Sequence, residues 1–190
     1  MRIIAAAIAV AFAAPVLAQD AALTKFQEEA RKTSADFGRK LGAELKKSLE
    51  AGGPEAAIGV CKDIAPATSS ELSRSKGWQV TRVSLKTRNP LLGLPDAWEQ
   101  KVLADFDKRV AAGEKAETLE FAEVVTEPQG PALRYMKAIP TQELCLTCHG
   151  PADKLAPGLK QKLAEQYPHD KATGYSVGQV RGAFSIKQPQ

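Results

Sequence analysis

Hydrophobic residues follow different periodicities in different parts of this chain. Between residues 20 and 50, and again between residues 54 and 76, apolar side chains recur every three or four positions, which predicts two long helices. Apolar, β-branched and aromatic residues predict strands at 78–85, 119–125, 131–139 and 180–186. Helices come first and most strands later, without a regular strand-helix-strand alternation. This order predicts the α+β class, with an antiparallel sheet and long N-terminal helices packed on it.

Glycine, proline and aspartate mark the ends of these elements. Gly52-Gly53-Pro54 separates the two long helices, Asp96 begins a further helix that Gly113 ends, and a short helix is predicted over 157–167. Pro66 lies inside the second helix, one turn after Cys61, and its missing N–H predicts a kink or break there. The apolar phase of segment 78–85 shifts halfway, which predicts a β-bulge.

The first eighteen residues are predicted to be a leader that does not belong to the folded domain. Met1 and Arg2 precede a charge-free run that ends Val16-Leu17-Ala18, a pattern typical of a secretory signal peptide that is cleaved after Ala18. The run is shorter than the roughly 20 apolar residues that a membrane-spanning helix needs. We therefore expect residues 1–18 to be removed, the mature chain to have no membrane span, and its location to be the periplasm.

Length and charge limit what the mature chain can be. Residues 19–190 suit one domain with its own hydrophobic core, because no long linker or internal repeat divides them. The formal net charge is +4, and removal of one positive charge, Arg2, leaves +3. Lys and Arg are interspersed with Asp and Glu, without a basic stripe interleaved with aromatic residues. No nucleic-acid partner is therefore expected.

The segment Cys145-Leu146-Thr147-Cys148-His149 has the Cys-x-x-Cys-His spacing of covalent c-type haem attachment. Two thiols one helical turn apart can add across the two vinyl groups of one porphyrin. The histidine that directly follows then lies beneath the iron as its proximal ligand. One such motif predicts one covalent haem c, bound through Cys145, Cys148 and His149.

Three other uses of these cysteines fit less well. A zinc site needs further ligands, and only His169 and Cys61 remain, at unsuitable spacing. A thioredoxin-like redox pair belongs at a strand-to-helix turn of a βαβ unit, which the pattern lacks. A structural disulfide explains neither the adjacent histidine nor the third thiol. Haem attachment is the favoured interpretation.

The distal ligand of the iron has few candidates: Cys61, Met136, His169 or a lysine. Methionine is usual in small electron-transfer cytochromes c, but Met136 precedes the motif and also fits a core position. His169 follows Pro168 in a turn-like stretch that suits a solvated loop. Cys61 is either a buried inert thiol or a ligand, and ligation would remove the liability of an unpaired thiol in an oxidising compartment.

Several short segments, taken in their order along the chain, resemble those of a known group of proteins. The segments are Ala57-Ile58-Gly59-Val60-Cys61, Gly77-Trp78, Ser84-Leu85-Lys86-Thr87-Arg88-Asn89-Pro90, Pro95-Asp96-Ala97-Trp98-Glu99, Arg134-Tyr135-Met136-Lys137-Ala138-Ile139-Pro140, Leu144 to Gly150, and Lys171 to Ile186. Through them the chain resembles the single-haem periplasmic c-type haem proteins with a PAS-like fold. Members of that family occur free-standing or as sensor modules of histidine kinases.

The resemblance implies a PAS-like antiparallel sheet with flanking helices, haem attached at Cys145 and Cys148, and His149 as proximal ligand. It also implies Cys61 as the distal ligand, in preference to the other candidates. Unlike the sensor members, this chain is expected to lack a transmembrane helix and a transmitter domain. Any signal would therefore need a separate partner.

Basic residues in the shared segments are candidates for neutralising the two haem propionates. Arg88 is the preferred one. Arg134, Lys86 and Lys137 are weaker candidates, since a solvated strand face explains their charges as well.

Two functions are compatible with this site. We expect a cytochrome that exchanges single electrons with a redox partner protein. The alternative is a redox or small-gas sensor in which carbon monoxide or nitric oxide replaces the distal ligand and a separate partner receives the signal. A peroxidase-like enzyme would need a distal acid/base side chain, and the sequence offers no obvious distal histidine, so no enzymatic activity is expected. The long first helix suits either a homodimer contact or burial in the chain's own core.

Overall fold

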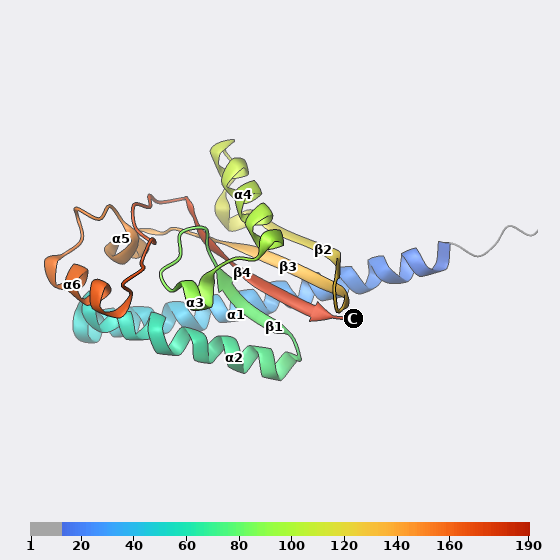
Figure 1. Cartoon of the computed structure of the whole chain (residues 1–190), viewed down its shortest axis with the longest axis horizontal. Coiled ribbons are helices and arrows are strands. Elements are labelled where there is room, and N and C mark those ends of the chain that lie inside the picture. The colour runs from blue at the N-terminus through green and yellow to red at the C-terminus, as the bar shows by residue number, and fades with distance from the viewer. Residues whose placement is uncertain (1–12) are drawn as a thin grey trace, which may run out of the picture.

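The first part of the computed structural model, which describes residues 13–190, is a hairpin of helices (Figure 1). α1 covers Ala13–Gly59 and changes direction at Gly52 and Gly53, whose backbone angles are non-helical. A π-helical turn, Val60–Ile64, leads into α2, Ala65–Lys76. The predicted break between the two long helices and the predicted end of the second are therefore confirmed.

The π-helical turn shows how the second helix accommodates Pro66. A proline inside an α-helix lacks the N–H that would bond the carbonyl four residues earlier. Here the N–H of Ala65 bonds the carbonyl of Val60, five residues earlier, so the backbone is already widened before Pro66. The predicted disturbance is present, but it includes Cys61 itself and does not follow it by a turn.

Four antiparallel strands form one sheet in the order β1-β4-β3-β2. Their bounds are β1 Gln79–Val83, β2 Glu120–Glu127, β3 Gly130–Pro140 and β4 Val180–Pro189. Each segment that the sequence predicts as a strand contributes one of them. The α+β class, with an antiparallel sheet and long N-terminal helices packed on it, is confirmed.

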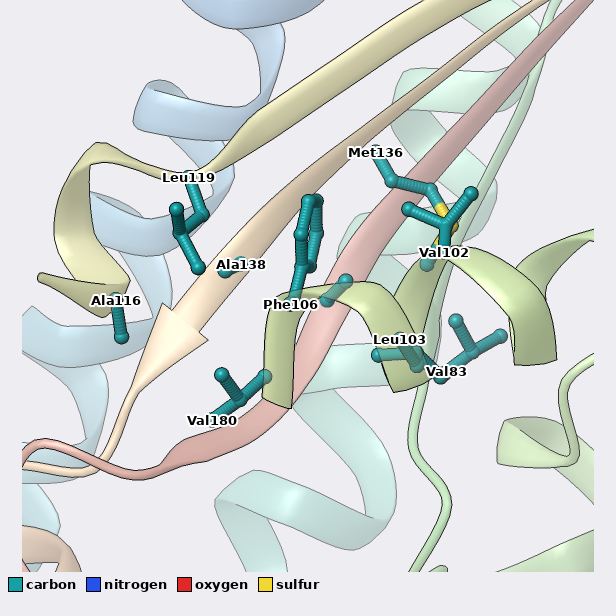
Figure 2. Close-up of a cluster of buried hydrophobic side chains, with 10 residues drawn as sticks. Val83, Val102, Leu103, Phe106, Ala116, Leu119, Met136, Ala138 and Val180 are labelled. Carbon is teal, nitrogen blue, oxygen red and sulfur yellow. The ribbon is translucent and has the colours of Figure 1, made fainter. Parts of the chain in front are cut away.

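Helices cover both faces of the sheet. On one face, α1 packs on alternate residues of β1, β3 and β4, and the buried side chains are Phe26, Ala30, Phe37, Val80, Leu133, Tyr135, Phe184 and Ile186. On the other face lies α4, Ala97–Ala111, over a second core that includes Val83, Phe106 and Met136 (Figure 2). Asp96 begins α4 with a capping box to Glu99, as the sequence predicts for this position.

The predicted bulge in the first strand is wrong. β1 pairs with β4 in a continuous register. Val80 packs in the core beneath α1, whereas Val83 packs in the core beneath α4. The apolar phase therefore changes along the strand because both of its faces are buried. The register shift in this sheet lies between β3 and β4, at Ile139 and Pro140.

Short helices complete the fold. They are α3, Pro90–Gly93, then α5, Glu143–His149, and α6, Pro157–Gln166. α5 and α6 lie at the end of the molecule where the helical hairpin turns (Figure 1). No helix within residues 13–190 combines the length and apolarity needed to cross a membrane. Most of the predicted signal peptide, residues 1–12, lies outside the described residues.

Candidate functional site

α5 carries the Cys-x-x-Cys-His motif on one short helix. The helix places Cys145 and Cys148 about one turn apart. Both thiols are free and partly exposed, and the N–H of Gln142 donates to the sulfur of Cys145 over 3.3 Å. Burial raises the pKa of Cys148, whereas the positive charge of Arg88 lowers it. Two unpaired thiols therefore lie side by side at one end of the molecule.

The His149 ring is held in one tautomer. Its Nδ1 lies 2.6 Å from the carbonyl oxygen of Ala172. Since a carbonyl only accepts, Nδ1 carries the proton and Nε2 keeps its lone pair free. The Nε of Arg181 lies 3.3 Å from the same Nδ1. A nitrogen that donates to Ala172 cannot also accept, so the Arg181 contact brings charge beside the ring and no second hydrogen bond.

The surroundings also keep His149 uncharged. Burial, followed by the positive charges of Arg181 and Arg88, lowers the pKa of His149 well below 6.5, and the hydrogen bond to Ala172 only partly opposes this. The ring of Tyr175 meets the histidine ring edge-on, with centroids 6.3 Å apart. A neutral imidazole with a free Nε2 and a fixed orientation is the form in which histidine binds a metal.

Backbone hydrogen bonds fix the main chain on either side of His149. Gly174 donates to the carbonyl of Gly150 at 2.8 Å, and Tyr175 donates to the carbonyl of His149 at 2.9 Å. A Cβ at Gly150 would lie 2.6 Å from the carbonyl oxygen of Leu146, so only glycine fits directly after the histidine. The segment around Gly174 thus acts as a support behind α5.

Arg88 connects α5 to that support. The side chain is 8% exposed, its Nε donates to Asp170 at 3.0 Å, and its second terminal nitrogen donates to the carbonyl of Cys148 at 2.6 Å. The other oxygen of Asp170 accepts the N–H of Ala172 at 2.7 Å. Arg88 is therefore close to the motif, as expected, but these bonds go to protein groups. Its binding of a propionate stays a prediction.

Cys61 lies in the π-helical turn and is partly buried. Ile58, one turn earlier, packs with Leu159 of α6, and Cys148 packs against the same cluster. The negative charge of an ionised Cys61 adds to the burial that raises the pKa of Cys148. Burial, with a smaller contribution from Cys61, also raises the pKa of Tyr167 to about 12. The structure thus brings Cys61 to the same end of the molecule as α5.

The other distal candidates lie elsewhere. Met136 is fully buried beneath α4, where Figure 2 shows it pointing toward Val102. Its sulfur belongs to the hydrophobic core. His169 is exposed in the loop after α6.

Of the weaker basic candidates, only Lys86 lies beside the histidine. Its ammonium group donates to the carbonyl of Thr173 at 2.9 Å and lies 4.5 Å from the ring centroid of Tyr175. Lys137 donates to the carbonyl of Glu117, on the face covered by α1. Arg134 binds carboxylates on the face covered by α4.

The sequence patterns did not identify two further arginines as candidate site residues. Arg181 of β4 lies behind His149 and donates to the hydroxyl of Ser84 at 3.0 Å. Arg82 of β1 points toward α1, with its guanidinium carbon 5.7 Å from the ring centroid of Phe37. Burial lowers the pKa of both arginines. The alternation of the strand could have indicated Arg82, because Arg82 lies on the same face of the strand as the buried Val80.

Exposed leucines lie next to these charges. Leu91 and Leu94, in and just after α3, are 92% and 69% exposed. α3 is fixed to the end of β1, where Ser84 donates to the carbonyl of Gly93 at 3.1 Å. Thiols, a neutral histidine, unpaired positive charge and exposed apolar surface are therefore combined at one end of the sheet. A large planar group with an apolar body and an anionic edge fits this combination.

Comparison with known families identifies the chain's relatives. The sequence model of the Tll0287-like family matches residues 11–189. The chain belongs to the Tll0287-like family. The crystal structure of the cyanobacterial heme-protein Tll0287 is similar to this structure with a TM-score of 0.55 and 30% sequence identity, covering 69% of this chain and 72% of that one. No curated protein matches. This member of the Tll0287-like family is thus related to a heme protein over two thirds of its length.

Proposed function

We propose that this protein is a mono-haem c-type cytochrome of the periplasm that transfers single electrons. One haem is attached to Cys145 and Cys148, with His149 as proximal and Cys61 as distal ligand. The observation that carries the proposal is the state of His149: neutral, with Nε2 free, directly after two free thiols on one helix. When bound, haem supplies an iron that changes its oxidation state by one electron.

Residues behind the histidine prepare it for this role. The bond to Ala172 fixes the tautomer, Tyr175 limits rotation of the ring, and Arg88 anchors the end of α5. None of these groups has to move for an electron to enter or leave. Such a rigid setting favours electron transfer because little reorganisation accompanies the change of charge.

The assignment of the distal iron ligand rests on where the candidate side chains lie relative to α5. Cys61 lies at the α5 end of the molecule, whereas Met136 is packed in the core beneath α4 and His169 is in the loop after α6. A thiolate at Cys61 is a soft ligand, suited to iron, and its negative charge is close to Arg82. We further propose that the sheet with its flanking helices is PAS-like, that residues 19–190 are one domain, and that the protein has no enzymatic activity.

A sensor role is the second candidate, favoured by one observation. Cys61 lies in a π-helical turn, which differs from α-helix by a single inserted residue and is common at functional sites. Such a turn can relax and withdraw its side chain, which would leave room for carbon monoxide or nitric oxide. A signalling partner would then have to respond to the hairpin of α1 and α2.

Expression in a host with cytochrome c maturation machinery tests both candidates. The mature chain should begin at Gln19 and keep one haem after acid-acetone extraction, seen as an intact mass above that of the bare polypeptide. A mass equal to the polypeptide would refute haem attachment. Absorption spectra of the reduced protein with and without carbon monoxide then separate the roles. Electron transfer predicts no carbon monoxide binding, and rapid binding would favour the sensor.

A further inference from the structure

Arg181 places a positive charge directly behind the imidazole of His149. The Nε of Arg181 lies 3.3 Å from Nδ1 of the histidine. Nδ1 donates its own proton to the carbonyl oxygen of Ala172 at 2.6 Å, so it has no lone pair with which to accept from Arg181. The contact between the arginine and the histidine is therefore electrostatic, and it lies at the ring nitrogen that does not bind the iron.

Ser84 and Tyr175 fix the guanidinium in this position. A terminal nitrogen of Arg181 donates to the hydroxyl of Ser84 at 3.0 Å, and that hydroxyl lies 2.8 Å from the carbonyl oxygen of Arg181. Ser84 therefore contacts both ends of the arginine. The guanidinium carbon also lies 5.3 Å from the ring centroid of Tyr175, whose edge meets the histidine ring. The distance between the charge and His149 is thus set by the fold.

The charge of Arg181 has no carboxylate beside it. Within residues 13–190, the polar partners of its side chain are uncharged: the ring of His149, the hydroxyl of Ser84 and the carbonyl of Lys86 at 3.4 Å. Arg88 differs, because Asp170 lies 3.0 Å from its Nε and offsets its charge. Arg181 is therefore the arginine whose field acts on the histidine without a counter-charge.

A charge at this place acts on the electron affinity of a metal bound at Nε2. The hydrogen bond from Nδ1 to the Ala172 carbonyl makes the imidazole a stronger electron donor, which favours the oxidised metal. The guanidinium of Arg181 opposes this effect at the same nitrogen. Oxidation adds one positive charge to the metal, and a positive charge held nearby in a poorly solvated site makes that step less favourable.

We propose that Arg181 is a positioning residue that acts through His149 and raises the midpoint potential of the haem. This inference rests on the proposed function, because it presumes an iron at Nε2 of His149. The hydrogen bond to Ala172 and a thiolate at Cys61 both favour ferric iron. Arg181 offsets part of their effect from behind the proximal ligand, without contacting the iron or leaving its place when an electron enters.

Five holoproteins test the proposal: the parent, Arg181→Met, Arg181→Lys, Ser84→Ala and the control Lys187→Met. Lys187 lies on the same strand and pairs with Glu127 at 3.0 Å. It is six residues from Arg181, about 20 Å along the strand, so its removal changes the net charge equally but far from the histidine. Intact mass establishes the haem content, ferric electron paramagnetic resonance reports the ligand pair, and a redox titration measures the midpoint potential.

Arg181→Met should keep the parent resonance spectrum, because both ligands remain. At a fixed applied potential it should lower the ratio of ferrous to ferric protein by about tenfold, which corresponds to 59 mV for a one-electron couple. Arg181→Lys keeps the charge and should stay closer to the parent. Ser84→Ala releases the guanidinium and should lower the ratio by a smaller factor. Lys187→Met should match the parent.

An unchanged potential in haem-loaded Arg181→Met would overturn the proposal. Equal losses in Arg181→Met and Arg181→Lys would also overturn it, since shape and not charge would then be responsible, as would an equal loss in Lys187→Met. If Arg181→Met binds no haem or changes the resonance spectrum, Ser84→Ala decides, and an unchanged potential there contradicts the proposal. A parent without haem defeats the proposed function itself, whereas a loaded parent whose potential is insensitive to Arg181 defeats this inference alone.

Discussion

Two arginines on the same sheet have opposite surroundings. Arg134 of β3 lies on the face covered by α4 and is bound by the carboxylates of Asp96, Glu99 and Glu127, at 2.7, 3.3 and 3.3 Å. Arg82 of β1 lies on the face covered by α1 and has no carboxylate partner within residues 13–190. The charge of Arg134 is therefore balanced by carboxylates of the fold, whereas the guanidinium of Arg82 lies near the ring of Phe37.

The same contrast extends to the sulfur atoms. Met136, two residues after Arg134, is fully buried among aliphatic and aromatic side chains. The three cysteines at the other end are free and only partly buried. Beneath α4 the charge of Arg134 is balanced by carboxylates, although its Nε has no hydrogen-bond partner, and Met136 is packed in the core, whereas the thiols around α5 are free. The first region is specified for stability and the second for binding.

The largest expected effect comes from removing the attachment thiols. Cys145→Ala combined with Cys148→Ala should abolish covalent haem completely, because no thiol remains beside the proximal histidine. Cys148→Ala alone should leave at most one weaker attachment. Intact mass after acid-acetone extraction measures both. If the double variant retained all of its haem, Cys145 and Cys148 would not be the attachment sites, and the contrast between the two regions would be wrong.

The paired arginine should matter more for stability than the unpaired one. Arg134→Met leaves the buried Glu99 and the partly buried Glu127 without their counter-charge and should reduce the free energy of unfolding by about 3–5 kcal/mol. Arg82→Met removes a charge that no protein group balances, so its effect on the haem-free protein should be small or even stabilising. Urea unfolding of haem-free protein compares the two variants. Equal losses would contradict the contrast between the two arginines.

Met136→Ala sharpens the comparison for the sulfur atoms. Loss of a fully buried side chain from the core should reduce the free energy of unfolding by about 2–5 kcal/mol. The absorption spectrum of the holoprotein should stay unchanged, because this sulfur lies beneath α4. A spectral change at constant haem content would place Met136 at the iron after all.

The smallest expected effect on stability comes from an ion pair between β2, at the edge of the sheet, and α1. Glu120 accepts hydrogen bonds from Arg31 at 2.5 Å and from the hydroxyl of Tyr135 at 2.9 Å. The bond to Arg31 is the largest cause that lowers the pKa of Glu120 from 4.5 to about 2. Because the folded state holds the carboxylate ionised, this stabilisation is present above pH 4.5 and is lost as the pH falls toward 2.

Unfolding measured across this pH range should separate the parent from Glu120→Gln. The parent should be the more stable protein at neutral pH, and the difference should shrink as the pH falls below 4.5. A difference that stays constant down to pH 2 would assign the role of Glu120 to packing and not to charge.

The sequence predicted the parts of this molecule that depend on local patterns. Helix periodicity, the Gly52-Gly53 break, the Asp96 cap and the strand segments all follow from neighbouring residues, and the structure has them. The bulge in β1 was wrong because a single sequence does not show that a second helix covers the other face. The Cys145-to-His149 motif was visible as a local spacing.

Long-range contacts account for what the sequence did not show. Arg82 and Arg181 come from the first and the last strand of the sheet, and the pairing of β1 with β4 brings these strands together. Their surroundings follow from the whole fold. The same applies to Arg88, whose contact with Asp170 joins residues 82 positions apart.

The ligand pair of the iron is tested most directly by electron paramagnetic resonance of ferric Cys61→Ala, with Met136→Ala as the matched control. A thiolate favours ferric iron, so Cys61→Ala should keep its covalent haem, lose the parent spectrum and raise the midpoint potential. Met136→Ala should keep both spectrum and potential. If Cys61→Ala retained the parent spectrum and potential while Met136→Ala lost them, the cysteine ligand would be wrong and the protein would be a His/Met electron carrier.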